Sequence, residues 1–520
     1  MTLATVNLDD KYTLDSGRIF ITGIQALVRL PLMQRQRDIA AGLNTAGFIS
    51  GYRGSPLGGL DQQLWKAKNY LEENQIEFQP GLNEDLAATA VWGSQQSQLF
   101  NDSLVDGIFG LWYGKAPGVD RSGDVFKHGN AAGTSKHGGV LLLSGDDHTC
   151  KSSTLPSQTE YAFMDAMIPV LAPANVQEYL DFGIHGIALS RYSGCWVSFK
   201  TLAETVETSA SVYVDPHRVQ IKEPTDFELP EGGVSIRYPF PPLEQERMLH
   251  QYKLYAALAY ARANNLNHPV IDGPNRRIGI VTTGKSYLDV MQALEDLHID
   301  AEYAAKIGIS VYKVGMVWPL ERDGIRQFAE GLEEIIVVEE KRAVIENQLK
   351  EQLYNWRGDV RPRVVGKFDE GGDWVLPSID ELTPARIARV LVERLRKTRE
   401  GTTADMETHF EKRLNFLAEK EKQLSARKPS LARTPFFCSG CPHNTSTRVP
   451  EGSRALAGIG CHYMVQWMDR STDTFTQMGG EGVTWVGQSK FSKTKHVFAN
   501  LGDGTYMHSG LLAIRQAIAA

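Results

Sequence analysis

The sequence is short of the features that mark secreted, membrane-spanning or nucleic-acid-binding proteins. Only 5 of its 520 residues are cysteine, too few for a disulfide scaffold. No apolar run is long enough to span a bilayer, and the first residues lack the basic and apolar regions of a signal peptide. The net charge of -7 provides no general basic surface for nucleic acid or anionic lipid. We therefore expect a cytoplasmic globular protein without membrane or nucleic-acid partners.

The 42% of hydrophobic residues and the length of 520 residues suit roughly three or four domains of about 150 residues each. Strand-like runs alternate with helical ones in two blocks, a pattern that predicts an α/β fold with parallel sheets. Asn175 is expected to cap one of the helices. The predicted segments are an α/β domain at 1–215, a linker with an amphipathic helix at 216–274, a second α/β domain at 275–395, a charged, exposed helical connector at 396–432, and an incomplete third α/β domain at 433–520.

Near its end the chain has an apolar run that finishes at Gly502-Asp503-Gly504. The apolar residues after this turn have helical spacing, which favours strand-turn-helix over the hairpin that Asp-Gly otherwise suggests. A carboxylate between two glycines at the end of a strand can hold a hard cation through oxygen, while bare backbone approaches a diphosphate. Because only one strand and one helix accompany this turn, we expect the sequence to be part of a longer polypeptide.

Three of the cysteines lie close together in the sequence. Cys438 and Cys441 share one tight loop, and Cys461 follows a Gly-Ile-Gly turn that could return a third sulfur to the same point. Thiolates at this spacing hold zinc or an iron-sulfur cluster. Zinc could take His443 or His462 as a further ligand, whereas a cubane cluster would need another cysteine. A redox-active Cys-x-x-Cys pair is a third interpretation, but it leaves Cys461 unexplained.

Residues 279–286 match the Walker A pattern, with Gly284-Lys285-Ser286 at its end. A working phosphate loop follows its strand, but here Gly279 falls inside the predicted strand and the spacer Ile-Val-Thr-Thr is rich in β-branched residues. We interpret the match as chance and keep a P-loop NTPase only as an alternative.

Together these pieces resemble the thiamine-diphosphate-dependent 2-oxoacid:ferredoxin oxidoreductases, specifically the indolepyruvate ferredoxin oxidoreductase family in its long fused form. That family has Cys-x-Gly-Cys-x-His, Gly-Ile-Gly-Cys and Gly-Asp-Gly in this order, here at 438–443, 458–461 and 502–504. The resemblance implies several thiamine-enzyme-like, doubly wound parallel-sheet domains with the last one truncated. They are a pyrimidine-binding domain at 1–215, a transketolase C-terminal-like domain at 275–395 and the start of a diphosphate-binding domain at 433–520.

The family's Asn-Glu-x-x-Ala segment matches residues 83–87 and implies that Glu84 is the acid that activates thiamine by a hydrogen bond to its aminopyrimidine. Without the resemblance, Glu84 is a first-turn helix glutamate. The loop at 51–56 resembles the family's substrate loop and implies substrate contacts by Ser55 and by Arg53, which replaces a proline. Lys127 and His128 resemble a catalytic Lys-His pair at the cofactor pocket.

The implied reaction is oxidative decarboxylation of an aryl or branched-chain 2-oxoacid to acyl-CoA, with electrons passing to ferredoxin. The implied cofactors are thiamine diphosphate, Mg²⁺ on Asp503 and a [4Fe-4S] cluster, with coenzyme A as co-substrate. Gly502, Gly504 and Thr505 would adjoin the diphosphate, and Cys438, Cys441 and Cys461 would carry the cluster. A homo-oligomer is expected for the complete protein, and this chain alone is expected to be inactive. The alternatives are a non-redox thiamine decarboxylase or transferase and an inactive fragment that acts only as a subunit.

Overall fold

The structure is a computed structural model that describes residues 6–426 and 434–520. The chain forms two compact units, residues 1–422 and 423–520, which are described separately below. Residues 427–433, which include the end of the predicted connector and the first residue of the predicted third domain, lie outside the described residues. None of the helices in the described ranges combines the length and apolar character that a bilayer crossing requires.

A seven-stranded sheet forms the first half of the larger unit, and its strand order is β12-β6-β7-β5-β4-β2-β3. All neighbouring pairs are parallel except β12 with β6. The strands are β2 (Thr45–Gly51), β3 (Ile76–Phe78), β4 (Gly107–Lys115), β5 (Val140–Asp146), β6 (Val170–Leu171), β7 (Val197–Leu202) and β12 (Met316–Trp318).

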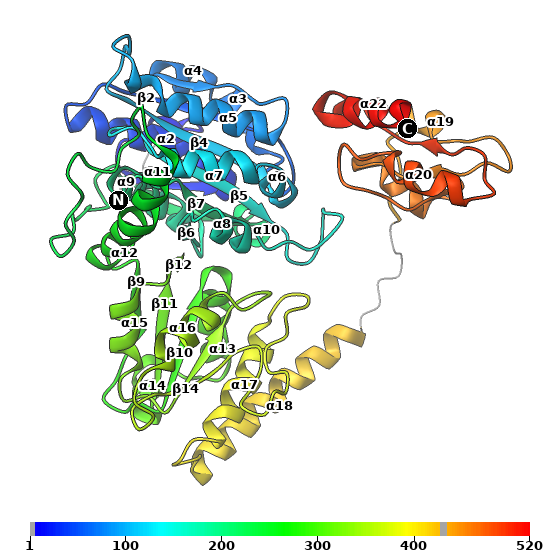
Figure 1. Cartoon of the computed structure of the whole chain (residues 1–520). Coiled ribbons are helices and arrows are strands. Elements are labelled where there is room, and N and C mark those ends of the chain that lie inside the picture. The colour runs from blue at the N-terminus through cyan, green and yellow to red at the C-terminus, as the bar shows by residue number, and fades with distance from the viewer. Residues whose placement is uncertain (1–5, 427–433) are drawn as a thin grey trace. The chain divides into compact units, whose positions relative to one another are not determined.

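Helices cover both faces of this sheet (Figure 1). Along β5, Leu141 and Leu143 belong to one buried core, whereas Val140 and Leu142 belong to the other. The first core is covered by α2 (Gly23–Ala40), α9 (Val176–Ser193) and α12 (Leu254–Ala263), and the second by α5 (Glu84–Gln95), α6 (Ala116–Arg121) and α7 (Gly123–Ala132). Asn175 caps α9 as predicted, because its side chain accepts a hydrogen bond from the Glu178 backbone at 3.0 Å.

A second, five-stranded sheet follows in the order β14-β13-β10-β11-β9. Its strands are β9 (Asn267–Ile271), β10 (Ile278–Thr283), β11 (Ile309–Val314), β13 (Glu334–Val338) and β14 (Arg363–Val365), and only β9 runs antiparallel. The segment expected to be a linker therefore supplies a strand. β12 comes from this block yet pairs with the first sheet, and one hydrophobic core contains residues from both sheets. The two sheets are thus joined by a shared strand and a shared core.

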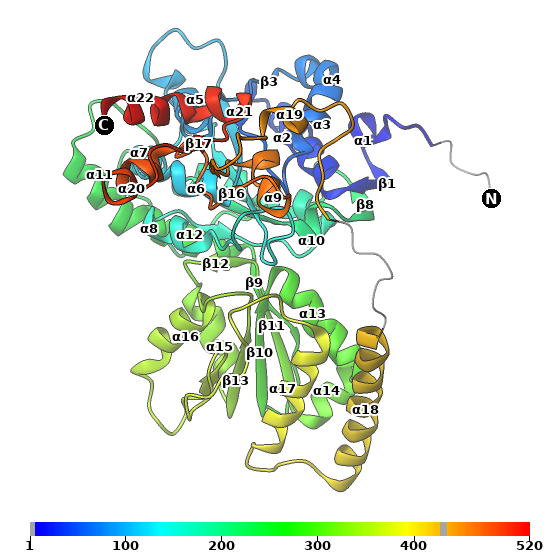
Figure 2. The same ribbon diagram turned by 90° about the vertical axis from the view of Figure 1, so that its right-hand side faces the viewer.

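Helices α13 (Gly284–Asp296), α16 (Ile345–Tyr354) and α17 (Pro384–Arg396) pack on the second sheet (Figure 2). The helix α18 (Ala404–Ala426) lies beside α17, joined to it by ion pairs such as Arg396 with Glu407 at 2.6 Å. Met406, Phe410 and Leu417 are buried against the core of the second sheet. The prediction of an exposed, solvated connector helix is wrong for this face, because α18 is amphipathic and part of the packed unit.

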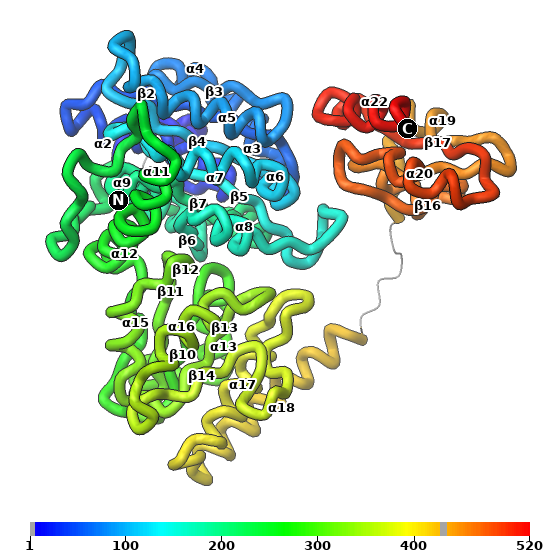
Figure 3. The backbone as a smooth tube through the Cα atoms, viewed as in Figure 1, coloured from blue at the N-terminus to red at the C-terminus, as the bar shows by residue number. Residues whose placement is uncertain are grey.

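The smaller unit has a three-stranded parallel sheet in the order β16-β15-β17, drawn in orange and red in Figure 3. The strands are β15 (Ala455–Leu456), β16 (Thr472–Asp473) and β17 (Phe498–Ala499). After β17 the chain turns into α21 (Asp503–Thr505), a π-helical turn at Tyr506–Gly510 and α22 (Leu511–Ala519). The predicted strand-turn-helix is confirmed, and the hairpin alternative is wrong.

Candidate active site

The candidate site of the larger unit lies where β2, β4 and β5 end. These three strands are neighbours and parallel, so their carboxyl ends share one edge of the sheet. The predicted substrate loop at 51–56 follows β2, Lys115 ends β4, and a polar loop at 147–159 follows β5. In open α/β sheets this edge is where ligands bind.

Glu84 is the first residue of α5 and is only 7% exposed. The Asn83 side chain caps the helix by accepting from the Leu86 backbone at 3.1 Å, and the Trp112 indole donates to the Glu84 carbonyl at 2.9 Å. The first turn of a helix favours a carboxylate. Leu82 and Leu86 on either side are half exposed, at 53% and 52%. Glu84 is therefore a buried acid at the start of a helix, and two large apolar side chains are exposed close to it in the sequence.

Gly118 in α6 fixes the position of the Glu84 side chain. A Cβ at Gly118 would lie 2.5 Å from Cγ of Glu84 and 2.9 Å from its Oε1. We expect Gly118→Ala to displace Glu84 and to lower the free energy of unfolding by about 1–3 kcal/mol, the usual cost of overpacking. Urea denaturation measures this change.

The matched control is Gly123→Ala, because Gly123 begins α7 and a Cβ there meets no atom within 4 Å. Alanine in an open helical position is expected to be neutral or to stabilise by up to about 1 kcal/mol. Equal effects of the two substitutions would show that Gly118 places no constraint on Glu84.

Ser55 lies in the loop after β2 and contacts the loop after β5. The Ser152 hydroxyl donates to the Ser55 hydroxyl at 2.7 Å, and the Lys115 ammonium donates to the Ser152 carbonyl at 3.3 Å. Arg53 is exposed in the same loop. The structure thus places Ser55 beside a buried strand end, whereas Arg53 faces solvent.

Asp147 organises the loop after β5. Its carboxylate accepts from the backbone of Lys151 at 3.0 Å and of Ser152 at 2.9 Å, and from the Ser153 hydroxyl at 2.9 Å. Burial alone would raise the pKa of Asp147, but these hydrogen bonds lower it below its usual value. The ionised carboxylate therefore holds Ser152 against Ser55.

Lys127 and His128 lie on the exposed face of α7. Lys127 forms a 2.6 Å ion pair with Asp165, and His128 lies 3.4 Å from the carboxylate of Asp124 on the same helix. All four side chains are more than half exposed. Their catalytic roles stay a prediction, since the contacts described here are those of surface residues.

In the smaller unit the three sequence motifs lie together. The Cys441 thiol is 2.9 Å from Nδ1 of His443, and the rings of His443 and His462 are 4.5 Å apart. A Cβ at Gly502 would lie 3.4 Å from the His462 ring. Burial, and then the nearby His443, lower the pKa of His462 to about 4, so its ring is neutral at pH 7.

The residues of the Gly-Asp-Gly turn suit a metal-bound diphosphate. Asp503 and Gly504 are exposed, whereas Thr505 is buried. An exposed carboxylate between glycines can bind a hard cation through oxygen while the backbone remains accessible to phosphate oxygens. This donor set fits Mg²⁺ and a diphosphate group.

The cysteines do not show the same fit to a metal. Cys438 and Cys461 are exposed and Cys441 is partly buried. Within residues 6–426 and 434–520, no three His, Cys, Asp or Glu side chains are grouped as metal ligands. The sequence motifs converge here, but the thiols do not form a preorganised cluster site.

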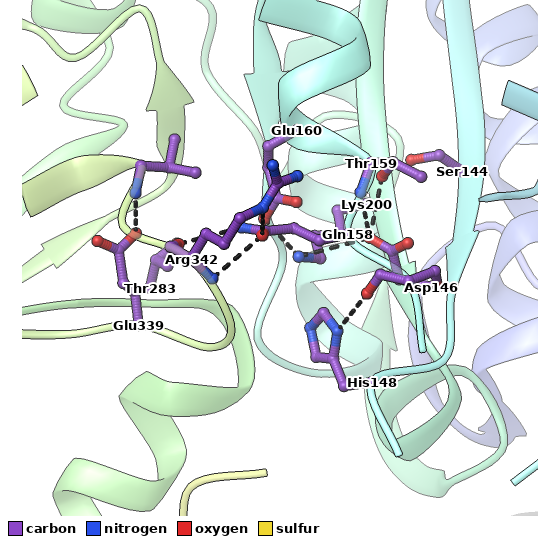
Figure 4. Close-up of polar contacts among 12 residues, drawn as sticks. Ser144, Asp146, His148, Gln158, Thr159, Glu160, Lys200, Thr283, Glu339 and Arg342 are labelled. Atoms are coloured by element: carbon purple, nitrogen blue, oxygen red, sulfur yellow. Dashed lines mark hydrogen bonds and ion pairs between the residues drawn. The ribbon is translucent and has the colours of Figure 1, made fainter. Parts of the chain in front are cut away.

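A second polar cluster lies between the two sheets of the larger unit (Figure 4). Asp146 accepts from the backbone and hydroxyl of Thr159 at 3.1 and 2.9 Å. Lys200 pairs with Glu160 in the same buried cluster, and Gln158 exchanges hydrogen bonds of 3.1 Å with the backbone of Arg342. These contacts link the end of β5 to the loop after β13 and hold the two sheets together.

The Walker-like residues border this cluster. Gly279 lies within β10, and Lys285 contacts carboxylates of Asp289, Glu340 and Glu381 at 2.7, 3.4 and 3.5 Å. The adjoining cavity measures about 20 Å³, far below the roughly 300 Å³ at which ligand pockets begin. A lysine neutralised by three acids beside so small a cavity argues against nucleotide binding.

We expect Lys285→Ala to destabilise the protein by roughly 2–3 kcal/mol, because it leaves partly buried carboxylates unpaired. Adding Mg-ATP should not change the unfolding midpoint of either the wild type or the variant. Lys68→Ala is the control, since Lys68 forms an exposed pair with Glu72 and should have little effect. Stabilisation of the wild type by Mg-ATP that Lys285→Ala abolishes would restore the NTPase alternative.

Comparison with known proteins agrees with this architecture. The fold resembles that of 2-oxoglutarate:ferredoxin oxidoreductase from Magnetococcus marinus, with a TM-score of 0.50 and 14% identity over 73% of this chain and 65% of the other. The protein therefore has the parallel-sheet α/β fold found in a 2-oxoacid:ferredoxin oxidoreductase.

Comparison of the amino-acid sequence with known proteins gives a more specific similarity than the fold does. A model of the indolepyruvate ferredoxin oxidoreductase middle domain matches residues 267–427. Indolepyruvate oxidoreductase subunit IorA of Pyrococcus abyssi is 27% identical over 74% of this chain and 58% of its own length. IorA of Methanothermobacter marburgensis is 24% identical over 99% of this chain and 75% of its own length. The chain is thus similar in sequence to members of the indolepyruvate ferredoxin oxidoreductase family, which confirms the resemblance seen in the sequence.

The chain spans 58% of the length of the Pyrococcus relatives. These relatives are named as subunits, so the fused form stays a prediction.

Sequence reasoning missed Lys115, Asp147 and Ser152. The sequence held a usable signal for Lys115, because it stands between an aromatic run and an Ala-Pro pair that begins a helix, as a residue at the end of a strand does. The loop residues carried no comparable motif.

Proposed function

We propose that this chain acts in the oxidation of a 2-oxoacid, with an aryl or branched-chain acid resembling indolepyruvate as substrate, acyl-CoA as product and ferredoxin as electron acceptor. The observation that supports this most strongly is Glu84, a buried acid that begins α5. The chain just before it is bonded to the start of the loop at 51–56, because the Gly81 backbone donates to the Gly51 carbonyl at 2.9 Å. The names of the relatives and their domain model support the substrate class.

Thiamine diphosphate, when bound, supplies the electron sink that decarboxylation of a 2-oxoacid needs. Glu84 would hold a proton opposite the aminopyrimidine N1′, and the fixed approach of Gly118 keeps its carboxyl in place. Asp503 would bind Mg²⁺, and Gly502, Gly504 and Thr505 would adjoin the diphosphate. Ser55 would contact the substrate, with Arg53, Lys127 and His128 as further candidates at the rim.

The two half-sites belong to different units, so the proposal requires them to meet within one chain or between two copies in a homo-oligomer. Coenzyme A and ferredoxin would be used by the complete enzyme in the cytoplasm. A [4Fe-4S] cluster on Cys438, Cys441 and Cys461 stays a prediction, because these thiols are not grouped as metal ligands in the described residues.

The second candidate function is a non-redox thiamine enzyme, which the ungrouped arrangement of the three cysteines in the described residues favours.

One experiment separates the two candidate functions. The assembled enzyme, reconstituted anaerobically with iron and sulfide, should reduce ferredoxin when given indolepyruvate, thiamine diphosphate and Mg²⁺, and reduction should require coenzyme A. Release of carbon dioxide and an aldehyde without reduced ferredoxin or bound iron would instead establish the non-redox function.

A further inference from the structure

Lys115 occupies a central position at the carboxyl edge of the first sheet. β4, which it ends, lies between β2 and β5. The loop after β2 therefore passes on one side of Lys115 and the loop after β5 on the other. A side chain at this point can reach a ligand held between the two loops.

The contacts of Lys115 connect both loops. Its ammonium donates to the carbonyl of Ser152, whose hydroxyl in turn donates to Ser55 at 2.7 Å. Gly54 packs on the aliphatic stem, since a Cβ there would lie 3.0 Å from Cδ of Lys115. The ammonium and the two hydroxyls are thus held at one junction.

The charge of Lys115 is not neutralised by a contacting acid. Among the described residues, no carboxylate oxygen lies within 4.0 Å of its ammonium. Asp147 attracts Lys115 electrostatically, but its oxygens accept from the backbone and the hydroxyl of its own loop. Burial lowers the pKa of Lys115 below its usual value, and the opposing effects of Asp147 and Cys150 are smaller. An anion bound at this junction would compensate the charge of Lys115.

Lys115 also lies near the proposed reacting centre. It is followed by α6, in which Gly118, three residues further on, contacts Glu84. An anionic group bound by Lys115 would therefore be on the same end of β4 as the activating acid. Arg53, the cation suggested by the loop sequence, is exposed instead.

We infer that Lys115, together with the Ser55 hydroxyl that Ser152 orients, binds the carboxylate of the 2-oxoacid substrate, and that Arg53 has a lesser role. This inference rests on the proposed function. A positive charge beside a hydroxyl donor is an arrangement that recognises a carboxylate through charge-assisted hydrogen bonds. Lys115 thereby selects acids over their neutral analogues.

The test compares binding of indole-3-lactate, an unreactive acid, with binding of its methyl ester to the assembled enzyme saturated with thiamine diphosphate and Mg²⁺. The wild type should bind the acid more tightly than the ester. Lys115→Met should reduce affinity for the acid by about 10- to 100-fold, the value of a hydrogen bond between charged groups, and leave affinity for the ester unchanged. Lys115→Arg should retain most of the preference.

Lys68→Met is the matched control, because Lys68 is exposed and pairs with Glu72 on the surface. Unfolding curves of each variant identify any loss due to misfolding, which would weaken acid and ester alike. The inference is overturned if Lys115→Met keeps the preference for the acid, or if Arg53→Met removes it and Lys115→Met does not. Both outcomes leave the proposed function intact when thiamine diphosphate still binds. A wild type that binds no thiamine diphosphate would refute the proposed function, and the inference with it.

Discussion

Glu84→Gln is expected to slow hydrogen-deuterium exchange at C2 of bound thiamine diphosphate by about 100- to 10,000-fold, the contribution that a positioned acid or base makes to proton transfer. Glutamine fills the space beside Gly118 and keeps the start of α5 intact, but its amide cannot carry the proton that a carboxyl group shares with the aminopyrimidine. Acid-quenched samples analysed by proton NMR measure the exchange rate, and a separate titration measures cofactor affinity.

The control for this experiment is Glu72→Gln, because Glu72 is 56% exposed in its surface pair with Lys68. It should exchange like the wild type. If Glu84→Gln also exchanges like the wild type with cofactor bound, Glu84 is only the first-turn helix glutamate that its local sequence suggests. A fall in cofactor affinity without a change in exchange rate would equally contradict the activating role.

Asp503→Asn is expected to weaken Mg²⁺-dependent binding of thiamine diphosphate by about 100-fold or more, since even partners that only support a metal ligand are worth roughly 10- to 100-fold in metal affinity. The exposed Asp503 carboxylate between two glycines is the donor that a hard cation needs, and an amide oxygen lacks its charge. Titration of the cofactor at several Mg²⁺ concentrations measures the effect.

Asp469→Asn tests whether any exposed acid of the smaller unit has this effect. Asp469 is exposed and lies outside the Gly-Asp-Gly turn. Its substitution should leave cofactor affinity unchanged. Equal losses in both variants, or the same loss for Asp503→Asn without Mg²⁺, would show that Asp503 does not hold the metal.

Much of the fold could be predicted because its buried strands are continuous apolar runs. Glu334–Val338 and Val140–Asp146 are covered on both faces, which leaves little alternation to confuse with a helix. β4 is harder to predict over its whole length, because three glycines interrupt its pattern. A Cβ at Gly107, Gly110 or Gly114 would lie within 2.8 Å of a neighbouring atom, so close packing requires these glycines.

Other features depend on distant parts of the chain. β12 has three residues and joins a sheet whose other strands all precede it by more than 100 residues, so no local pattern indicates its partner. The buried face of α18 was readable in the spacing of Met406, Phe410 and Leu417 but was obscured by the surrounding charges.

The residues of the candidate site also differ in whether the sequence alone can predict them. Glu84, Ser55 and Asp503 stand in short motifs that sequence reasoning can find. Lys115 and Ser152 acquire their place only when neighbouring strands bring two loops together, an arrangement that residue types alone do not encode.

An experimental structure of the assembled enzyme with thiamine diphosphate and Mg²⁺ tests the central claim most directly. The account predicts one thiamine between the units, with the Glu84 carboxyl within hydrogen-bonding distance of N1′ and the Asp503 carboxylate on the magnesium ion. Two acids too far apart to share a cofactor, in every pairing of chains, would contradict it.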